Sequence, residues 1–169
     1  LDGGPAPAAG TVRVHRLRAP EQVFIDRYWE KPDQILLRER EFRRYFPHFA
    51  YENEDEPRNW PKVQMHLEQP FNTTESNTME LPVADWPVAH YVMIVKTEDQ
   101  QGQVVEVTRY FSLFDSKEKT VPAGILSWQL LGTEMAEPGE EASLYLATAA
   151  DGLYVLVEKE RRDDLEPVG

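Results

Sequence analysis

The residues best suited to chemistry lie in two neighbouring segments, ADWPVAHY at 84–91 and EVTRY at 106–110. If these segments pair as a hairpin across residues 98–103, His90 and Tyr110 come within a residue or two of opposing positions. Carboxyl, imidazole and phenol groups gathered on one curved sheet could act as acid–base groups or hold a polar ligand. The candidate set is Asp85, His90, Glu106, Arg109 and Tyr110.

Strand geometry limits how many of these side chains can share a pocket. Successive side chains point to opposite faces of a strand, so Glu106 and Tyr110 share one face while Arg109 points to the other. Polar pairs across a solvated face account for the same residues without catalysis. We therefore assign no catalytic residue, and we keep Asp85, His90, Glu106 and Tyr110 as candidates for contact with a ligand or partner.

A dense acidic stretch, YENEDEPRNWP at 51–61, raises the question of a cation site. A calcium loop of the EF-hand type needs a central glycine and a glutamate at its last position, and this stretch supplies neither. We predict a solvated loop that Trp60 fixes to the body of the protein, with contact to a basic partner as the alternative. The carboxylates concerned are Glu52, Glu54, Asp55 and Glu56.

Two Trp-Pro steps, Trp60-Pro61 and Trp86-Pro87, each precede a predicted strand. An exposed Trp could stack on a sugar ring or anchor a protein partner. A Trp at a strand entrance more commonly closes the end of a core, which is what we expect here. Trp60 and Trp86 remain the aromatic candidates for partner contact.

The four histidines, His15, His48, His66 and His90, lie on different predicted elements and lack the local spacing of metal ligands. A zinc site would require convergence in space, for instance of His66 and His90 on neighbouring strands. The chain has no cysteine, which excludes disulfides and thiolate chemistry. Phosphate-binding glycine loops, the nucleophile elbow and the zinc-protease motif are absent as well. We predict no metal and no cofactor.

The N-terminal third is expected to supply the helices that cover these residues. Gly, Pro and Ala at 1–10 predict a flexible leader, and alternating apolar and basic residues at 11–18 predict a strand at a sheet edge. Residues 20–31 and 34–46 are predicted helices, each with apolar residues on one side and each followed by a proline. Within the second helix, Glu39 and Arg43 are four apart and are expected to pair.

The remainder reads as strands that form an antiparallel meander. The segment 104–114 is apolar on both faces, which predicts a central position in the sheet. Asp151-Gly152 is the strongest hairpin signal and predicts that residues 142–160 pair with each other around that turn. The other predicted strands are 62–68, 88–97 and 125–131.

This order of elements predicts a single α+β domain at 11–160, followed by a polar C-terminal tail at 161–169. We expect one or two N-terminal helices packed on a curved antiparallel sheet of about five to six strands. The alternative is a β-barrel with a helical N-terminal extension.

The charge of the chain is −12 at pH 7 and is unevenly distributed. Residues 1–50 carry nine Lys or Arg and seven Asp or Glu, whereas residues 51–169 carry nine and 23. Such an acidic chain repels nucleic acid and anionic lipid, and no apolar run is long enough for direct membrane insertion. A flexible leader is typical of the region after a removed signal or anchor, so we expect an extracytoplasmic location, periplasmic or membrane-anchored, with a cytoplasmic one as the alternative.

These features favour a non-catalytic binding or interaction module, the soluble extracytoplasmic domain of a secreted or membrane-anchored protein, with another protein as partner. A small-ligand-binding protein or an enzyme, with its pocket between sheet and helices, is the first alternative. An acidic inhibitor of the immunity-protein type is the second, because acidic surfaces accelerate the capture of basic partners. The sequence leaves the oligomeric state open.

Overall fold

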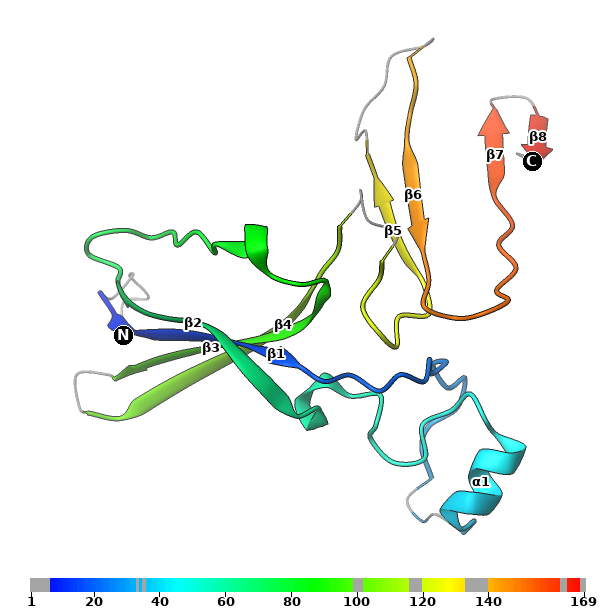
Figure 1. Ribbon diagram of the computed structural model, residues 1–169, viewed down its shortest axis with the longest axis horizontal. Coiled ribbons are helices and arrows are strands. Elements are labelled where there is room, and N and C mark those ends of the chain that lie inside the picture. The colour runs from blue at the N-terminus through cyan, green and yellow to red at the C-terminus, as the bar shows by residue number, and fades with distance from the viewer. Residues whose placement is uncertain are drawn as a thin grey trace.

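The protein is mostly sheet, and its main feature is a twisted four-stranded antiparallel sheet (Figure 1). The computed structural model describes residues 7–32, 34, 36–98, 102–115, 120–132, 140–161 and 164–167. The strands of the main sheet follow the order β2-β1-β3-β4, with β1 at Ala9–Leu17, β2 at Lys62–Asn72, β3 at Ala89–Glu98 and β4 at Val104–Leu113.

Two small two-stranded sheets follow in the chain. One pairs β5, Trp128–Leu131, with β6, Leu144–Ala147, and the other pairs β7, Glu158–Arg161, with β8, Asp164–Pro167. The strands of the described part do not close into a barrel, so the barrel alternative is wrong. Strands in three separate sheets also replace the predicted continuous meander.

The first strand lies inside the main sheet, and its predicted edge position is wrong. β1 pairs antiparallel with β2 on one side and with β3 on the other. Its basic side chains do not guard an edge: Arg13 forms an ion pair with Glu68 of β2, at 2.6 Å between Nη2 and Oε1. Arg13, which the local pattern predicted at a solvent-exposed edge, therefore pairs with a residue of the neighbouring strand.

The fourth strand is at the edge, which corrects the central position predicted for it. Among the described strands β4 pairs with β3 alone, in a register that sets Val92 opposite Tyr110 and His90 opposite Ser112. The apolar side chains that suggested burial on both faces stay largely exposed, as Val104 and Val107 illustrate.

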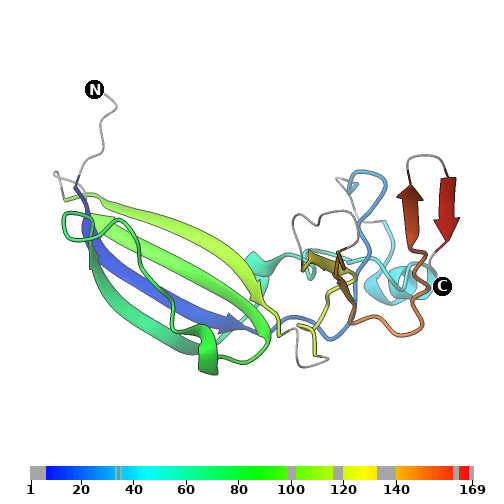
Figure 2. The ribbon, with the colours of Figure 1, turned by 90° about the horizontal axis from the view of Figure 1, so that it is seen from above.

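Alternation along β3 defines two faces of the sheet. The Tyr91 face holds a core of Val12, Val14 and Tyr91, which the segment 73–88 crosses and covers with partly buried apolar side chains (Figure 2). The His90 face holds a smaller core of Leu17, Val92 and Ile94, against which Trp60 packs.

The N-terminal helices are the largest departure from expectation. Residues 20–31 are not helical, and the second predicted helix is reduced to α1, Glu39–Tyr45, the only α-helix in the described residues. The expected pairing of Glu39 with Arg43 is confirmed at 2.8 Å. α1 lies beyond the end of the sheet and not against either face (Figures 1 and 2).

Long-range contacts explain why the first helix does not form. The Ile25 backbone N–H donates to the His48 carbonyl at 2.8 Å, and the Trp29 ring lies 5.2 Å from the Phe49 ring. A short isolated helix is marginal in water, so these tertiary partners outweigh the helical periodicity of the segment. No helix in the described part of the chain has the length and apolar character needed to cross a membrane.

The predicted C-terminal hairpin is also wrong. Asp151 and Gly152 do form a turn, with Gly152 at φ 69°, but residues 153–157 form no strand and β6 pairs with β5 instead. β8 lies inside the predicted polar tail, and β1 begins inside the predicted leader, at Ala9. Residues 1–6 of that leader lie outside the described residues.

Candidate functional site

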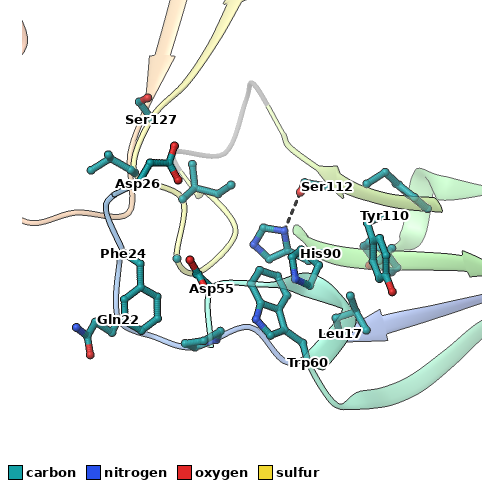
Figure 3. Close-up of a pocket in the computed structure, with 17 residues that line it drawn as sticks. Leu17, Gln22, Phe24, Asp26, Asp55, Trp60, His90, Tyr110, Ser112 and Ser127 are labelled. Atoms are coloured by element: carbon teal, nitrogen blue, oxygen red, sulfur yellow. Dashed lines mark hydrogen bonds between the residues drawn. The ribbon is translucent and has the colours of Figure 1, made fainter. Parts of the chain in front are cut away.

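A pocket of about 480 Å³ opens where the His90 face ends (Figure 3). Four parts of the chain enclose it: the ends of β3 and β4, the segment 17–26, the acidic loop with the short 3-10 helix η1, Pro57–Asn59, and the segment 124–127 that leads into β5. The side chains that define its character are Phe24, Asp26, Asp55, Trp60, His90 and Tyr110.

Strand register and a tight turn position the polar and aromatic walls. Because Ser112 is opposite His90 and Tyr110 is two residues away, all three side chains project from the His90 face. Trp60 caps the C-terminus of η1, and its indole Nε1 donates a 2.7 Å hydrogen bond to the Glu54 carbonyl. Its ring lies 4.9 Å from the His90 ring, tilted at 64°.

His90 is buried, with 8% of its surface exposed, and both ring nitrogens are occupied. Nε2 lies 2.8 Å from the Ala123 carbonyl oxygen, which can only accept, so Nε2 donates. Nδ1 therefore accepts from the Ser112 hydroxyl at 2.7 Å. Burial lowers the pKa of His90, and the hydrogen bond to Ala123 opposes this only in part. The ring is thus held neutral, as a fixed part of the wall.

The acidic loop divides into paired and free carboxylates. Glu54 forms an ion pair with Arg43 at 3.0 Å and accepts the Glu52 backbone N–H at 2.6 Å. Burial alone would raise the pKa of Glu54, but the backbone N–H groups around it and Arg43 bring it below its ordinary value. Glu56 pairs with Arg58. Neither carboxylate is free for a ligand.

Asp55 and Asp26 are the free carboxylates of the pocket. Both side chains are exposed, both line the cavity, and neither carboxylate has a hydrogen bond or an ion pair with another described residue. Figure 3 places them on the side of the pocket away from Tyr110. No lysine or arginine lines the pocket within the described part of the chain.

The structure brings together three of the residues singled out from sequence, Trp60, His90 and Tyr110. Glu106 lies farther along the same face and pairs with Lys96 at 2.8 Å. Arg109 is opposite Met93, on the Tyr91 face, as the alternation of the strand predicted.

Asp85 and Trp86 lie apart from this pocket. Asp85 ends the 3-10 helix η2, Val83–Asp85, and Trp86 caps it. The Trp86 ring lies 5.3 Å from Tyr91, so this Trp contributes to the core of the Tyr91 face.

His66 and His90 do not converge. The His66 ring contacts Trp86 and Tyr91, at 5.2 and 5.4 Å between centroids, whereas His90 projects from the opposite face. Burial, and secondarily Arg16, lowers the pKa of His66, and its Nε2 is buried without a hydrogen-bond partner among the described residues. Among the described residues, no three His, Cys, Asp or Glu side chains are grouped so as to hold a metal ion.

Sequence reasoning missed Phe24, Asp26 and Ser112. Strand register could have identified Ser112, since it is two residues beyond Tyr110 and opposite His90. Phe24 and Asp26 were assigned to a helix, and no local signal places them in the same pocket as Asp55.

The pocket therefore combines aromatic rings, a neutral histidine and two unpaired carboxylates. This chemistry suits recognition more than proton transfer, because the one imidazole has both nitrogens engaged. Comparison with protein-family models, with curated proteins and with solved structures finds no match to this chain.

Proposed function

We propose that this chain is a non-catalytic protein-binding module, whose partner covers the β5–β6 ribbon and enters the adjoining pocket. The observation that carries this proposal is the apolar character of both faces of the ribbon. Leu130 is opposite Tyr145 and Leu131 is opposite Leu144, so the two pairs project to opposite sides. Their exposed fractions are 46, 43, 62 and 46% for Leu130, Tyr145, Leu131 and Leu144.

Such a ribbon is poorly suited to stand alone in water. A two-stranded sheet is marginally stable without a layer packed against it, and contiguous exposed apolar side chains mark interaction surfaces. Leu153, Tyr154, Val155 and Leu156, which follow the ribbon in the chain, are exposed as well. Burial against a partner would supply the missing layer.

The ribbon is continuous with the pocket. Ser127 lines the cavity and Trp128 begins β5, where the Trp128 ring stacks on Phe114 with 4.2 Å between centroids. A protein partner could therefore contact the pocket and the ribbon together. A small ligand would fill the pocket and leave the ribbon uncovered, which is why we favour a protein.

Photo-crosslinking in the cells that make this protein tests the proposal. The full chain would carry p-benzoylphenylalanine at Leu131, and a matched control would carry it at Asn77, an exposed position in the segment that covers the Tyr91 face. We expect an adduct with a second polypeptide from position 131 alone. That polypeptide, once purified, must slow hydrogen exchange of the β5–β6 amides.

Two results would overturn the proposal. One is the lack of an adduct at position 131, and the other is an adduct whose mass equals two copies of this chain. The second would mean that the ribbon packs against itself in a dimer and not against another protein.

An enzymatic function is the second candidate, and the 2.7 Å contact of Ser112 with His90 favours it. A serine whose hydroxyl donates to an imidazole is the arrangement of an activated nucleophile. A fluorophosphonate probe would label such a serine, and Ser112→Ala would abolish the label. We expect no labelling of the wild-type chain, because Ser112 acts here as the hydrogen-bond donor that orients His90.

A further inference from the structure

We propose that the pocket binds an organic cation, an alkylammonium or guanidinium group, between the rings of Phe24 and Trp60 and the carboxylates of Asp26 and Asp55. The inference rests on the proposed function and deepens it, since a lysine or arginine side chain of the partner is the expected source. All four residues line the same cavity, and in the view of Figure 3 Asp55 projects between Phe24 and Trp60, with Asp26 on the side away from Tyr110.

The charge of the pocket favours a cation. Asp26 and Asp55 lack a partner among the described residues, although neighbouring Glu54 and Glu56 are paired with Arg43 and Arg58. The loop thus pairs Glu54 and Glu56 and leaves the carboxylates of Glu52 and Asp55 without an ion pair among the described residues, and of these two it is Asp55 that lines the cavity. Walls of low polarity strengthen the attraction of such carboxylates for a positive group.

The aromatic rings supply the second contribution. A cation over the face of a Trp or Phe ring gains from the ring quadrupole, and more so when water is excluded. Trp60 is already fixed by its hydrogen bond to the Glu54 carbonyl and by the His90 ring. Because this ring is ordered before binding, little conformational entropy remains to be lost.

The volume of the pocket and its apolar lining are compatible with a whole lysine or arginine side chain. A volume of about 480 Å³ falls within the range of ligand pockets. Leu17 and Ile125 offer apolar surface for the methylene part of an arginine or lysine. His90 contributes no opposing charge while it is neutral.

Titration of the isotope-labelled full chain with N-acetyl-arginine amide tests the site. The indole N–H resonance of Trp60, assigned by Trp60→Phe, reports binding, and N-acetyl-norleucine amide is the neutral matched probe. We expect a saturable shift with the arginine probe and a much weaker response to norleucine. The double variant Asp26→Asn, Asp55→Asn removes both negative charges and should weaken binding of the arginine probe about tenfold, a loss of about 1.4 kcal/mol.

Glu21→Gln, Glu75→Gln is the matched control, because it removes the same charge at exposed positions that do not line the pocket. Its affinity for the arginine probe should stay within twofold of wild type. An equal response to the neutral probe, the lack of any saturable shift, or unchanged affinity in the Asp26, Asp55 double variant would each overturn the cation site.

Two further experiments decide whether the cation is a side chain of the partner or a free amine. Spermidine replaces the arginine probe in one arm, and the position-131 crosslink is repeated with the Asp26, Asp55 double variant in the other. Loss of the adduct in the double variant identifies a basic side chain of the partner. A persistent adduct with tighter spermidine binding identifies a free amine, and the cation site then stands without the partner's side chain. If wild type gives no adduct, the proposed function fails while the probe titration still decides the cation site.

Discussion

His90 lines the pocket, but both of its ring nitrogens are engaged in hydrogen bonds, so it shapes the wall and is not poised for proton transfer. Its imidazole is buried, donates to the Ala123 carbonyl and accepts from the Ser112 hydroxyl. Protonation would place a charge in a buried site, and the Ser112 hydroxyl would have to turn in order to accept from Nδ1 instead of donating to it. The residue therefore links the shape of the pocket wall to pH.

The free energy of unfolding should fall as pH is lowered below about 6.5, the ordinary pKa of histidine. Burial lowers the folded-state pKa of His90, so the unfolded chain binds the proton first and the folded state is disfavoured until its own lower pKa is reached. Burial lowers the pKa of His15 and His66 in the same direction. Each group contributes at most about 1.4 kcal/mol per pH unit.

Urea unfolding at pH 7.5, 6.5 and 5.5 measures this dependence. His90→Gln can retain hydrogen bonds to Ser112 and Ala123 but does not titrate, so its pH slope should be shallower than that of wild type. Equal slopes for the two proteins would show that His90 is not a source of the pH dependence.

Adjacent carboxylates of the acidic loop should differ in their effect on stability. Glu54→Gln loses its ion pair with Arg43, and we expect a cost of about 1 kcal/mol because Glu54 also accepts a backbone N–H. Asp55→Asn should change the free energy of unfolding by less than about 0.5 kcal/mol, since its carboxylate has no partner among the described residues. Denaturant unfolding at pH 7 checks both, and a larger cost for Asp55→Asn would contradict the division of the loop.

Among the elements, β1 differs most clearly from its local pattern: the pattern predicted an edge strand, and the structure places it inside the sheet. It is paired on both sides, and its backbone passes close to that of β3 at Gly10. A Cβ built at Gly10 would overlap the Lys96 carbonyl oxygen and lie 3.0 Å from the Phe71 ring. The glycine is needed because two strands approach at this point, and not because of an unusual φ.

Gly10→Ala should therefore destabilise the protein by roughly 3 kcal/mol, the upper part of the range for overpacking. Gly102→Ala is the comparison, since Gly102 has φ 78° and nothing within 4 Å of a built Cβ. Its cost should be about 1 kcal/mol, from backbone conformation alone. Urea unfolding measures both variants. An equal or smaller loss for Gly10→Ala would mean that β1 and β3 can separate to admit a methyl group.

The whole molecule combines a packed sheet with an uncovered ribbon. Three of the fully buried side chains, Val14, Tyr91 and Val92, lie on β1 and β3, the two inner strands of the main sheet, and a fourth, Pro122, lies between β4 and β5. β5 and β6 lie beyond the end of that sheet (Figures 1 and 2). They expose apolar residues on both faces. Stability is therefore expected to be unevenly distributed along the chain.

Hydrogen exchange of the isolated chain should reveal this difference. Amides of β1 and β3 are expected to exchange most slowly, at rates set by global unfolding, and those of β5 and β6 much faster, through local opening. Mass spectrometry of peptic peptides from a monomeric sample measures both regions. Equal protection of the ribbon and of β1 would mean that the ribbon is stable without a partner, which would remove the support for the proposed function.

Local periodicity was sufficient to predict where the strands of the main sheet lie in the sequence. The segments 62–68, 88–97 and 104–114 predicted β2, β3 and β4, and the alternation that separated Arg109 from Glu106 and Tyr110 is confirmed. These properties depend on residues one to four positions apart, which the sequence displays directly.

Only the tertiary structure decided the strand order, the partner of β6, the loss of the helix at 20–31 and the placement of Asp26 and Asp55 in one pocket. Each of these depends on contacts between segments far apart in the chain, such as β1 with β3 or Ile25 with His48. The free energy of such contacts exceeds the small preferences of local sequence, and which segments meet is a property of the folded chain as a whole.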